Sequence, residues 1–109
     1  MLFRSAAVTG PVDHVSDGTR TTAVANGDPL LATITGSGCI STALTGCFAA
    51  VRADTPLEAA AFALAALGAA AEDAARGAPG PGTFHARLYD ALHALTPEGL
   101  DALANIADA

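Results

Sequence analysis

Short runs of apolar or alternating positions occupy the first third of the chain, which is the pattern of strands joined by turns. The runs fall at residues 6–8, 12–16, 19–24 and 30–34. Asp17-Gly18 and Asn26-Gly27 are dipeptides typical of tight hairpin turns. We therefore expect a β-meander over about residues 5–34, whose last strand leads into a glycine-rich turn.

The rest of the chain has apolar residues at every third or fourth position, the spacing of helices with a buried face. The predicted helices span about 38–51, 56–76, 83–95 and 97–106. Thr55-Pro56-Leu57-Glu58 has the form of a capping box with proline at the first helical position. Thr83 is expected to cap the third helix, and Gly77 to end the second. Residues 59–71 are apolar all round, so we expect burial on more than one side.

Composition and charge narrow the class of protein. A length of 109 residues with 51% hydrophobic side chains fits a single folded domain, residues 1–109, and argues against disorder. The net charge of −6 offers no basic surface for nucleic acid or an anionic membrane. The longest apolar stretch, residues 59–71, is shorter than the ~20 residues that span a bilayer. Residues 1–4 do not contain the long apolar segment of a secretory signal.

Cysteine spacing bears on the redox compartment. Cys39 and Cys47 lie on one predicted helix, about 12 Å apart along its axis. A disulfide needs Cα atoms within roughly 7 Å, so the helix excludes a bridge between them. We expect Cys47 in the core, because it falls on the apolar face of the helix. No Cys or His spacing typical of a metal site is present, so we expect no metal ligands in this chain and a reduced, cytoplasmic protein.

Acidic and histidine residues elsewhere have simpler interpretations than a catalytic one. Asp17 is explained by its hairpin turn, and Asp13 by a solvent-facing position on a strand. His14, His85 and His93 show no spacing of a ligand set, so we expect them at the surface or at an edge.

The stretch Thr35-Gly36-Ser37-Gly38-Cys39 is the strongest candidate for chemistry. Glycines at a turn before a helix let the backbone bend sharply and approach a ligand closely. The free N–H groups of the first helical turn, together with the helix dipole, favour an anion such as phosphate. A glycine-rich turn that binds no ligand has the same local pattern. The residues of the turn alone leave both interpretations open.

A set of motifs resembles the C-terminal part of hydroxyethylthiazole kinases, enzymes of the ribokinase-like superfamily. The motifs are Thr9-Gly10-Pro11-Val12-Asp13, Asp17-Gly18, Asn26-Gly27-Asp28-Pro29-Leu30-Leu31, Thr35-Gly36-Ser37-Gly38-Cys39 and Pro79-Gly80-Pro81-Gly82-Thr83-Phe84. The similarity runs from about Val8 to the C-terminus and covers only the later part of the family's chain. It implies an α/β, partial ribokinase-like fold and a truncated or internally started reading frame.

The resemblance implies roles for individual residues. Gly36, Ser37 and Gly38 match the family's anion hole for the transferred phosphoryl group, and Thr9 matches a residue near the ATP phosphates. Cys39 stands where related kinases carry a catalytic base, and a thiolate is favoured at a helix N-terminus. Gly36 and Cys39 would also contact the substrate. A packed thiol at Cys39 and an ordinary turn hydroxyl at Thr9 are the simpler alternatives.

The activity implied by the resemblance is ATP-dependent phosphorylation of the hydroxyl of 4-methyl-5-(2-hydroxyethyl)thiazole in thiamine salvage. It implies ATP and Mg²⁺ as cofactors, magnesium ligands that lie mostly before this chain begins, and a homotrimer with active sites between subunits. Little or no turnover is therefore expected of this chain alone. The alternatives are a hydroxymethylpyrimidine (phosphate) kinase, which has a similar glycine-rich turn, and a non-catalytic remnant that self-associates.

Overall fold

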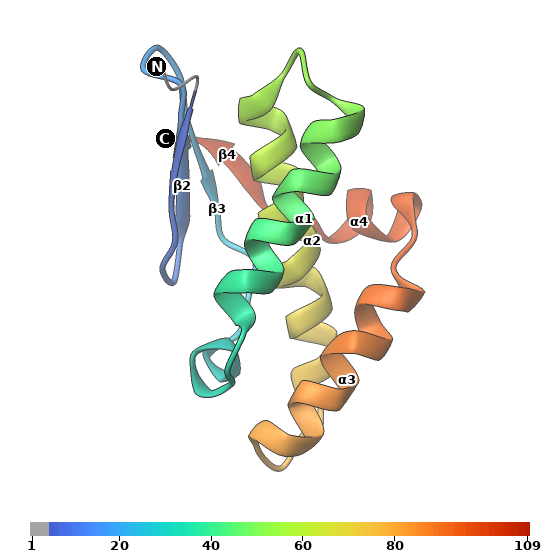
Figure 1. Ribbon diagram of the computed structural model, residues 1–109. Coiled ribbons are helices and arrows are strands. Elements are labelled where there is room, and N and C mark those ends of the chain that lie inside the picture. The colour runs from blue at the N-terminus through green and yellow to red at the C-terminus, as the bar shows by residue number, and fades with distance from the viewer. Residues whose placement is uncertain (1–4) are drawn as a thin grey trace.

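A four-stranded antiparallel sheet lies along one side of a layer of helices in the computed structural model, which describes residues 5–109 (Figure 1). The strands are β1 (Ala6–Val8), β2 (Asp13–Ser16), β3 (Thr21–Val24) and β4 (Ile106–Asp108), and they lie in the order β1-β2-β3-β4. The expectation about a secretory signal concerns residues 1–4, which lie outside the described part.

The helices follow the first three strands. They are the 3₁₀ helix η1 (Pro29–Thr33), α1 (Ser37–Val51), α2 (Pro56–Ala75), α3 (Pro81–Ala94) and α4 (Pro97–Leu103). Helix α2 is central: it contacts α1, α3, α4 and strands β2 and β3 (Figure 1). This arrangement confirms the predicted α/β class, with a meander first and helices after it.

The alanine-rich α2 is buried on several sides, as its sequence predicts. Almost every residue between Leu57 and Ala71 is buried, because alanine lets neighbouring elements approach its backbone closely. Its first half packs with Val15 and Val24 of the sheet, and its second half packs with Phe84 and Leu88 of α3. The core is therefore one long helix covered by the sheet at one end and by α3 at the other.

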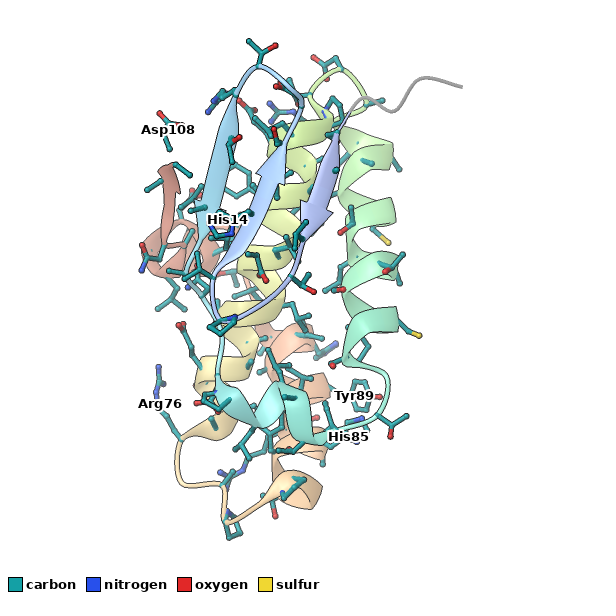
Figure 2. The ribbon with its side chains drawn as sticks, turned by 90° about the vertical axis from the view of Figure 1, so that its left-hand side faces the viewer. His14, Arg76, His85, Tyr89 and Asp108 are labelled. Carbon is teal, nitrogen blue, oxygen red and sulfur yellow. The ribbon has the colours of Figure 1, made fainter. Side chains whose placement is uncertain are left out.

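The sheet has an inner and an outer face. Asp13 and Val15 of β2 are buried toward α2, whereas His14 is exposed on the outer face (Figure 2). The expected solvent-facing position of Asp13 is therefore wrong. Val15 marks the buried face of the strand, and Asp13, two residues before it, shares that face.

The predicted strand at 30–34 is also wrong, because residues 29–33 form η1. Asp28 accepts a hydrogen bond from the Leu30 backbone N–H at 2.9 Å, and Pro29 occupies the first helical position. Both features begin a helical turn instead of a strand. Asn26-Gly27 is accordingly not a hairpin turn, and the chain reaches the glycine-rich turn from η1.

The fourth predicted helix, 97–106, is shorter than expected. Helix α4 ends at Leu103, and Ile106 pairs with Val24 as part of β4. The Asn26 side chain accounts for the change: its Nδ2 donates to the Leu103 carbonyl at 2.8 Å, and its Oδ1 accepts from the Asn105 N–H at 2.6 Å. These bonds hold the end of α4 against β3, where the chain continues as a strand.

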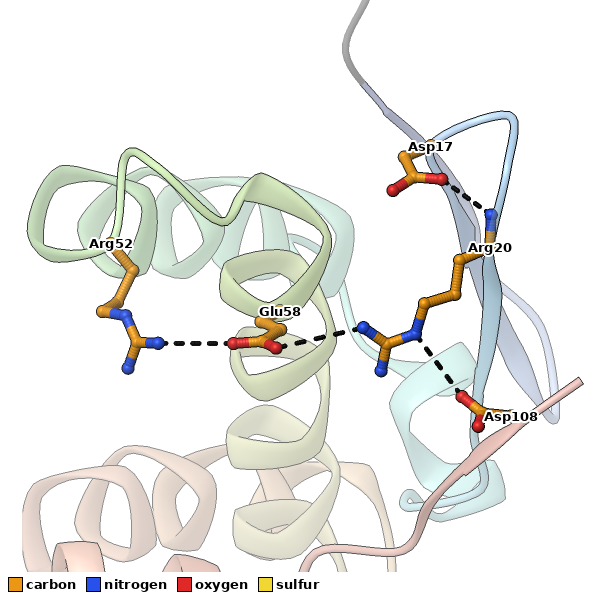
Figure 3. A network of polar contacts seen from close by, with 5 residues as sticks. All are labelled: Asp17, Arg20, Arg52, Glu58 and Asp108. Atoms are coloured by element: carbon orange, nitrogen blue, oxygen red, sulfur yellow. Dashed lines mark hydrogen bonds and ion pairs between the residues drawn. The ribbon is translucent and has the colours of Figure 1, made fainter.

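Two predicted caps are absent. Thr55 precedes α2, but its side chain makes no capping bond, and Glu58 instead pairs with Arg20 and Arg52 (Figure 3). Helix α3 starts at Pro81, two residues before Thr83, so Thr83 is not its cap. The expected end of α2 at Gly77 is correct within a residue, since Gly77 has a left-handed φ of 69°.

Candidate phosphate-binding site

A cavity of about 540 Å³ opens between the turn after β1, the segment around η1, the start of α1 and the middle of α2. Thr9 and Gly10 line it from the turn, and Ser37, Gly38 and Ser41 line it from α1. Segments far apart in the sequence therefore meet at one site.

The N-terminus of α1 reaches this cavity with no side-chain cap. Gly36 is the residue before the helix, and its φ of 95° lies in the left-handed region that glycine adopts without strain. Gly36 has no side chain that could cap the helix. The first backbone N–H groups of α1 therefore lack a side-chain capping partner. Because Ser37 and Gly38 line the cavity, the positive end of the helix dipole is presented to it.

The structure brings together some of the predicted site residues and not others. Thr9, Ser37 and Gly38 line the same cavity, although Thr9 is far from the turn in sequence. Gly36 and Cys39 belong to the same turn of chain but do not line the cavity, and the Cys39 side chain is exposed. The roles of all five residues remain predictions at this point.

Cys47 is exposed, so its predicted place in the core is wrong. Helix α1 contains no buried residue, because only α2 packs extensively against it. The apolar face predicted from the sequence is real, but part of it is left uncovered. Both cysteines are free thiols, in agreement with the predicted absence of a bridge between them.

Asp13 is a cavity-lining residue that the sequence did not reveal as such. Asp13 is only 9% exposed, and its Oδ1 accepts a hydrogen bond from the Gly10 N–H at 3.0 Å. Burial raises the pKa of this carboxyl above its ordinary value, while the Gly10 amide and the nearby His14 act in the opposite direction. Asp13 and Val15 are two residues apart on one strand and so share a face. Because Val15 is apolar, this spacing was the sequence signal that could have placed Asp13 on the buried face.

Another wall of the cavity is held by α2. Gly68 lies against Asn26, and the Glu72 carboxylate accepts hydrogen bonds from the Asn26 Nδ2 and the Gly27 N–H, each at 3.3 Å. Asn26, Gly27 and Gly68 all line the cavity. A lone glycine within an alanine-rich helix was the sequence signal for this close approach.

The described residues contain no compact cluster of metal-ligand side chains. Within residues 5–109, no group of three His, Cys, Asp or Glu side chains lies close enough to hold a metal ion. The Asp17 carboxylate takes part in its own hairpin turn: its Oδ1 accepts hydrogen bonds from the Thr19 and Arg20 backbone N–H groups at 2.9 and 2.8 Å. These amides lower the pKa of Asp17.

The histidines lie at the positions expected of surface residues. His93 is exposed. His14 is also exposed, and His85 contacts the Tyr89 hydroxyl at 3.1 Å on α3 (Figure 2). No helix within residues 5–109 has both the length and the apolar character needed to cross a bilayer.

Comparison with known proteins identifies the family. Residues 4–98 match the Hydroxyethylthiazole kinase family. The chain belongs to this family. A hydroxyethylthiazole kinase of Rubrobacter xylanophilus is 53% identical over 110 residues, which cover 99% of this chain and 41% of that protein. A hydroxyethylthiazole kinase of Pyrococcus furiosus is 55% identical over 100 residues, covering 92% of this chain and 37% of its own length.

A solved structure shares the fold. The hydroxyethylthiazole kinase protein from Pyrococcus horikoshii OT3 superposes with a TM-score of 0.89 at 47% identity, over 96% of this chain and 41% of the other. The superposition confirms the partial α/β fold of the hydroxyethylthiazole kinase family. The chain spans about two-fifths of the length of the relatives it matches.

Proposed function

We propose that this chain is the phosphate-binding portion of a hydroxyethylthiazole kinase, with residues 1–109 forming one domain. Its reaction would transfer the γ-phosphoryl group of ATP to the hydroxyl of 4-methyl-5-(2-hydroxyethyl)thiazole in thiamine salvage. The observation that carries the proposal is the shared cavity of Thr9, Ser37 and Gly38. These are three of the four residues that the resemblance assigns to phosphate, and they come from separate segments of the chain. The fourth, Gly36, adjoins Ser37 but does not line the cavity.

The α1 end of the cavity offers backbone donors to an anion, whereas the lining also contains the carboxyl groups of Asp13 and Asp28. A volume of about 540 Å³ falls within the ~300–1,000 Å³ of common ligand pockets. The uncapped amides of α1 at the cavity would donate to phosphoryl oxygens. Such donors are fixed by the helix before the reaction, so they stabilise charge that develops on the transferred group without having to reorganise.

Cys39 would act on the acceptor side of the same turn. Its thiol is exposed and lies outside the cavity, one residue beyond Gly38. We propose that the alcohol binds on this exposed side, between Cys39 and Gly36, with the phosphate in the cavity. The Cys39 sulfur would then accept the hydroxyl proton as the bond from the alcohol oxygen to the γ-phosphorus forms and the bond from that phosphorus to the ADP oxygen breaks, so that ADP leaves. The proton thus leaves the alcohol on the side opposite the nucleotide.

The remaining parts of the proposal come from the resemblance. ATP would bind as its magnesium complex, with the metal held mostly by residues that lie outside this chain in the family. A homotrimer is proposed for the full-length enzyme, and the uncovered helix α1 is consistent with further polypeptide against it. Free, exposed thiols suit a reducing compartment, so we propose the cytoplasm.

Isothermal titration of magnesium-ATP tests the proposal. In Gly38→Ala, the added Cβ meets no protein atom within 4 Å, so the fold is kept while the approach of a phosphate is obstructed. Gly46→Ala is the matched control, because Gly46 lies on the same helix, also in open space, and does not line the cavity. We expect a loss of affinity of about tenfold or more for Gly38→Ala, the equivalent of one charge-assisted hydrogen bond, and none for Gly46→Ala.

The alternatives give different results. A non-catalytic remnant gives no heat with magnesium-ATP, which would refute the proposal. A hydroxymethylpyrimidine kinase would bind hydroxymethylpyrimidine more tightly than hydroxyethylthiazole when the two alcohols compete. Thiazole-dependent ADP formation by this chain alone is expected to be very low, because the chain spans about two-fifths of its relatives.

A further inference from the structure

We propose that Asp13 is a positioning residue that holds the Thr9–Gly10 turn in the conformation that binds the nucleotide phosphates. This inference rests on the proposed function and adds to it a residue that the resemblance does not assign. Asp13 acts through the Gly10 amide and not through contact with ligand.

The first observation is a buried carboxyl group that forms no ion pair among the described residues. Asp13 is 9% exposed, and no arginine or histidine within residues 5–109 forms an ion pair with it. A buried carboxylate is costly unless hydrogen bonds compensate it, so its place calls for a structural or functional reason. The hydrogen bond from the Gly10 N–H to the Asp13 Oδ1, at 3.0 Å, is such a reason, because it compensates the carboxylate and holds the turn.

The second observation is where this bond lies. Gly10 directly follows Thr9, so a fixed Gly10 N–H fixes the peptide plane between the two residues. Thr9, Gly10 and Pro11 are themselves exposed, and residues 9–12 belong to no strand or helix. Nothing else among the described hydrogen bonds ties the Thr9–Gly10 peptide down. The carboxylate is thus an added anchor for a short loop whose ends are held by the pairing of Val8 with His14.

The third observation joins the anchor to the site. Asp13, Thr9 and Gly10 all line the cavity that also contains Ser37 and Gly38. Asp13 is in turn fixed by β2, where it pairs with Val24 of β3. The sheet therefore sets the position of Thr9 relative to the N-terminus of α1 in two ways, through the end of β1 at Val8 and through the Asp13 side chain. A loop without its anchor spends only a fraction of its time in the binding conformation, and the apparent affinity falls by that fraction.

Two variants separate positioning from contact and from simple destabilisation. Asp13→Asn keeps an oxygen that accepts the Gly10 N–H and removes the charge, whereas Asp13→Ala removes the acceptor. Hydrogen exchange of the Gly10 amide and the Kd for magnesium-ATP are measured well below the melting temperature of each variant. We expect Asp13→Ala to speed Gly10 exchange and weaken magnesium-ATP binding by about tenfold each, and Asp13→Asn to stay within about threefold of the wild type in both.

The outcomes are distinct. Unchanged Gly10 exchange in Asp13→Ala overturns the inference, and so does a loss of affinity in Asp13→Asn as large as in Asp13→Ala, since the charge would then act on the ligand itself. A change in melting temperature alone, with Kd unchanged, assigns Asp13 to stability and also overturns it. If the wild type does not bind magnesium-ATP, the proposed function fails, while Gly10 exchange still decides whether Asp13 anchors the turn.

Discussion

Gly68 of α2 lies directly against Asn26: a Cβ added to Gly68 would come 2.5 Å from the Asn26 Cβ and 2.6 Å from its carbonyl carbon. No other residue type fits there without moving the backbone of the cavity wall. The contact explains why a glycine interrupts the alanine-rich helix. It also fixes the position along α2 at which the segment after β3 crosses the helix.

Gly68→Ala is expected to destabilise the fold by about 1–3 kcal/mol, the typical cost of overpacking. The clash involves Asn26 backbone atoms, which cannot rotate away as a flexible side chain would. Urea denaturation measures the effect. Gly46→Ala is the control, because its Cβ meets nothing within 4 Å and alanine favours a helix by roughly 0.5–1 kcal/mol. A Gly68→Ala variant as stable as Gly46→Ala would show that the close approach does not exist.

Asn26→Ala is expected to cost about 2–4 kcal/mol of stability. The substitution leaves the Leu103 carbonyl and the Asn105 N–H without their 2.8 and 2.6 Å partners, and each orphaned group costs roughly 1–3 kcal/mol. Asn105→Ala is the matched control, since its backbone makes the bond and its exposed side chain does not. Chemical denaturation that finds the two variants equal would contradict the role of Asn26 in holding β4.

The pKa of Asp13 predicts a pH dependence with a definite sign. Burial raises the pKa of Asp13 in the folded protein above its value in the unfolded chain. The stabilisation that comes from its protonated form is therefore complete at pH values below the unfolded pKa, and it is lost as the pH rises through the folded pKa. Asp13→Asn removes this dependence. We therefore expect the melting temperature of Asp13→Asn relative to wild type to increase from about pH 4 to pH 7. A difference that is constant or shrinks over this range would mean that the carboxyl is not raised.

Asp17 provides the contrast, because its amide partners lower its pKa. Its contribution is present above the unfolded pKa and lost as pH falls through the folded one. The relative melting temperature of Asp17→Asn is therefore expected to move in the opposite direction at the acidic end of the range.

The ion pairs around Glu58 are expected to contribute little. Glu58 pairs with Arg20 at 4.0 Å and Arg52 at 3.3 Å, and Arg20 reaches Asp108 at 3.6 Å (Figure 3). All these side chains are more than 40% exposed, so Glu58→Gln should cost less than about 1 kcal/mol and approach zero in ~1 M salt. Glu98→Gln, in the first turn of α4, is the control. A cost that persists in high salt would mean that the network is not screened.

Periodicity along the chain was enough to predict the helices and the first strands. Alanine and leucine spacing gave α2 almost to the residue, because its burial follows from its own sequence. The prediction of Cys47 in the core failed for the opposite reason. The burial of a helical face depends on what covers it, and α1 is covered on one side only.

The errors in the remaining elements come from long-range contacts. Residues 30–34 are apolar enough for a strand, but Asp28 and Pro29 begin a helical turn instead. Ile106 fits the helical spacing of α4, yet it pairs with β3 because the distant Asn26 holds the chain there. No local pattern contains such a contact.

The candidate site was predictable in part. Thr9, Ser37 and Gly38 follow from motifs, and these three residues line one cavity, whereas Gly36 and Cys39 of the same motif do not. Asp13 and the Gly68–Asn26 contact were missed, since both depend on which face of an element meets α2.

The central claim is that the amides at the start of α1 and the Thr9 turn together bind the phosphates of ATP. Titration of the ¹⁵N-labelled chain with magnesium-ATP, followed by amide NMR, tests it directly. The account predicts saturable shifts at Ser37, Gly38 and Thr9, with Gly46 and Gly99 unmoved. Saturating nucleotide that leaves Ser37 and Gly38 unshifted would contradict it.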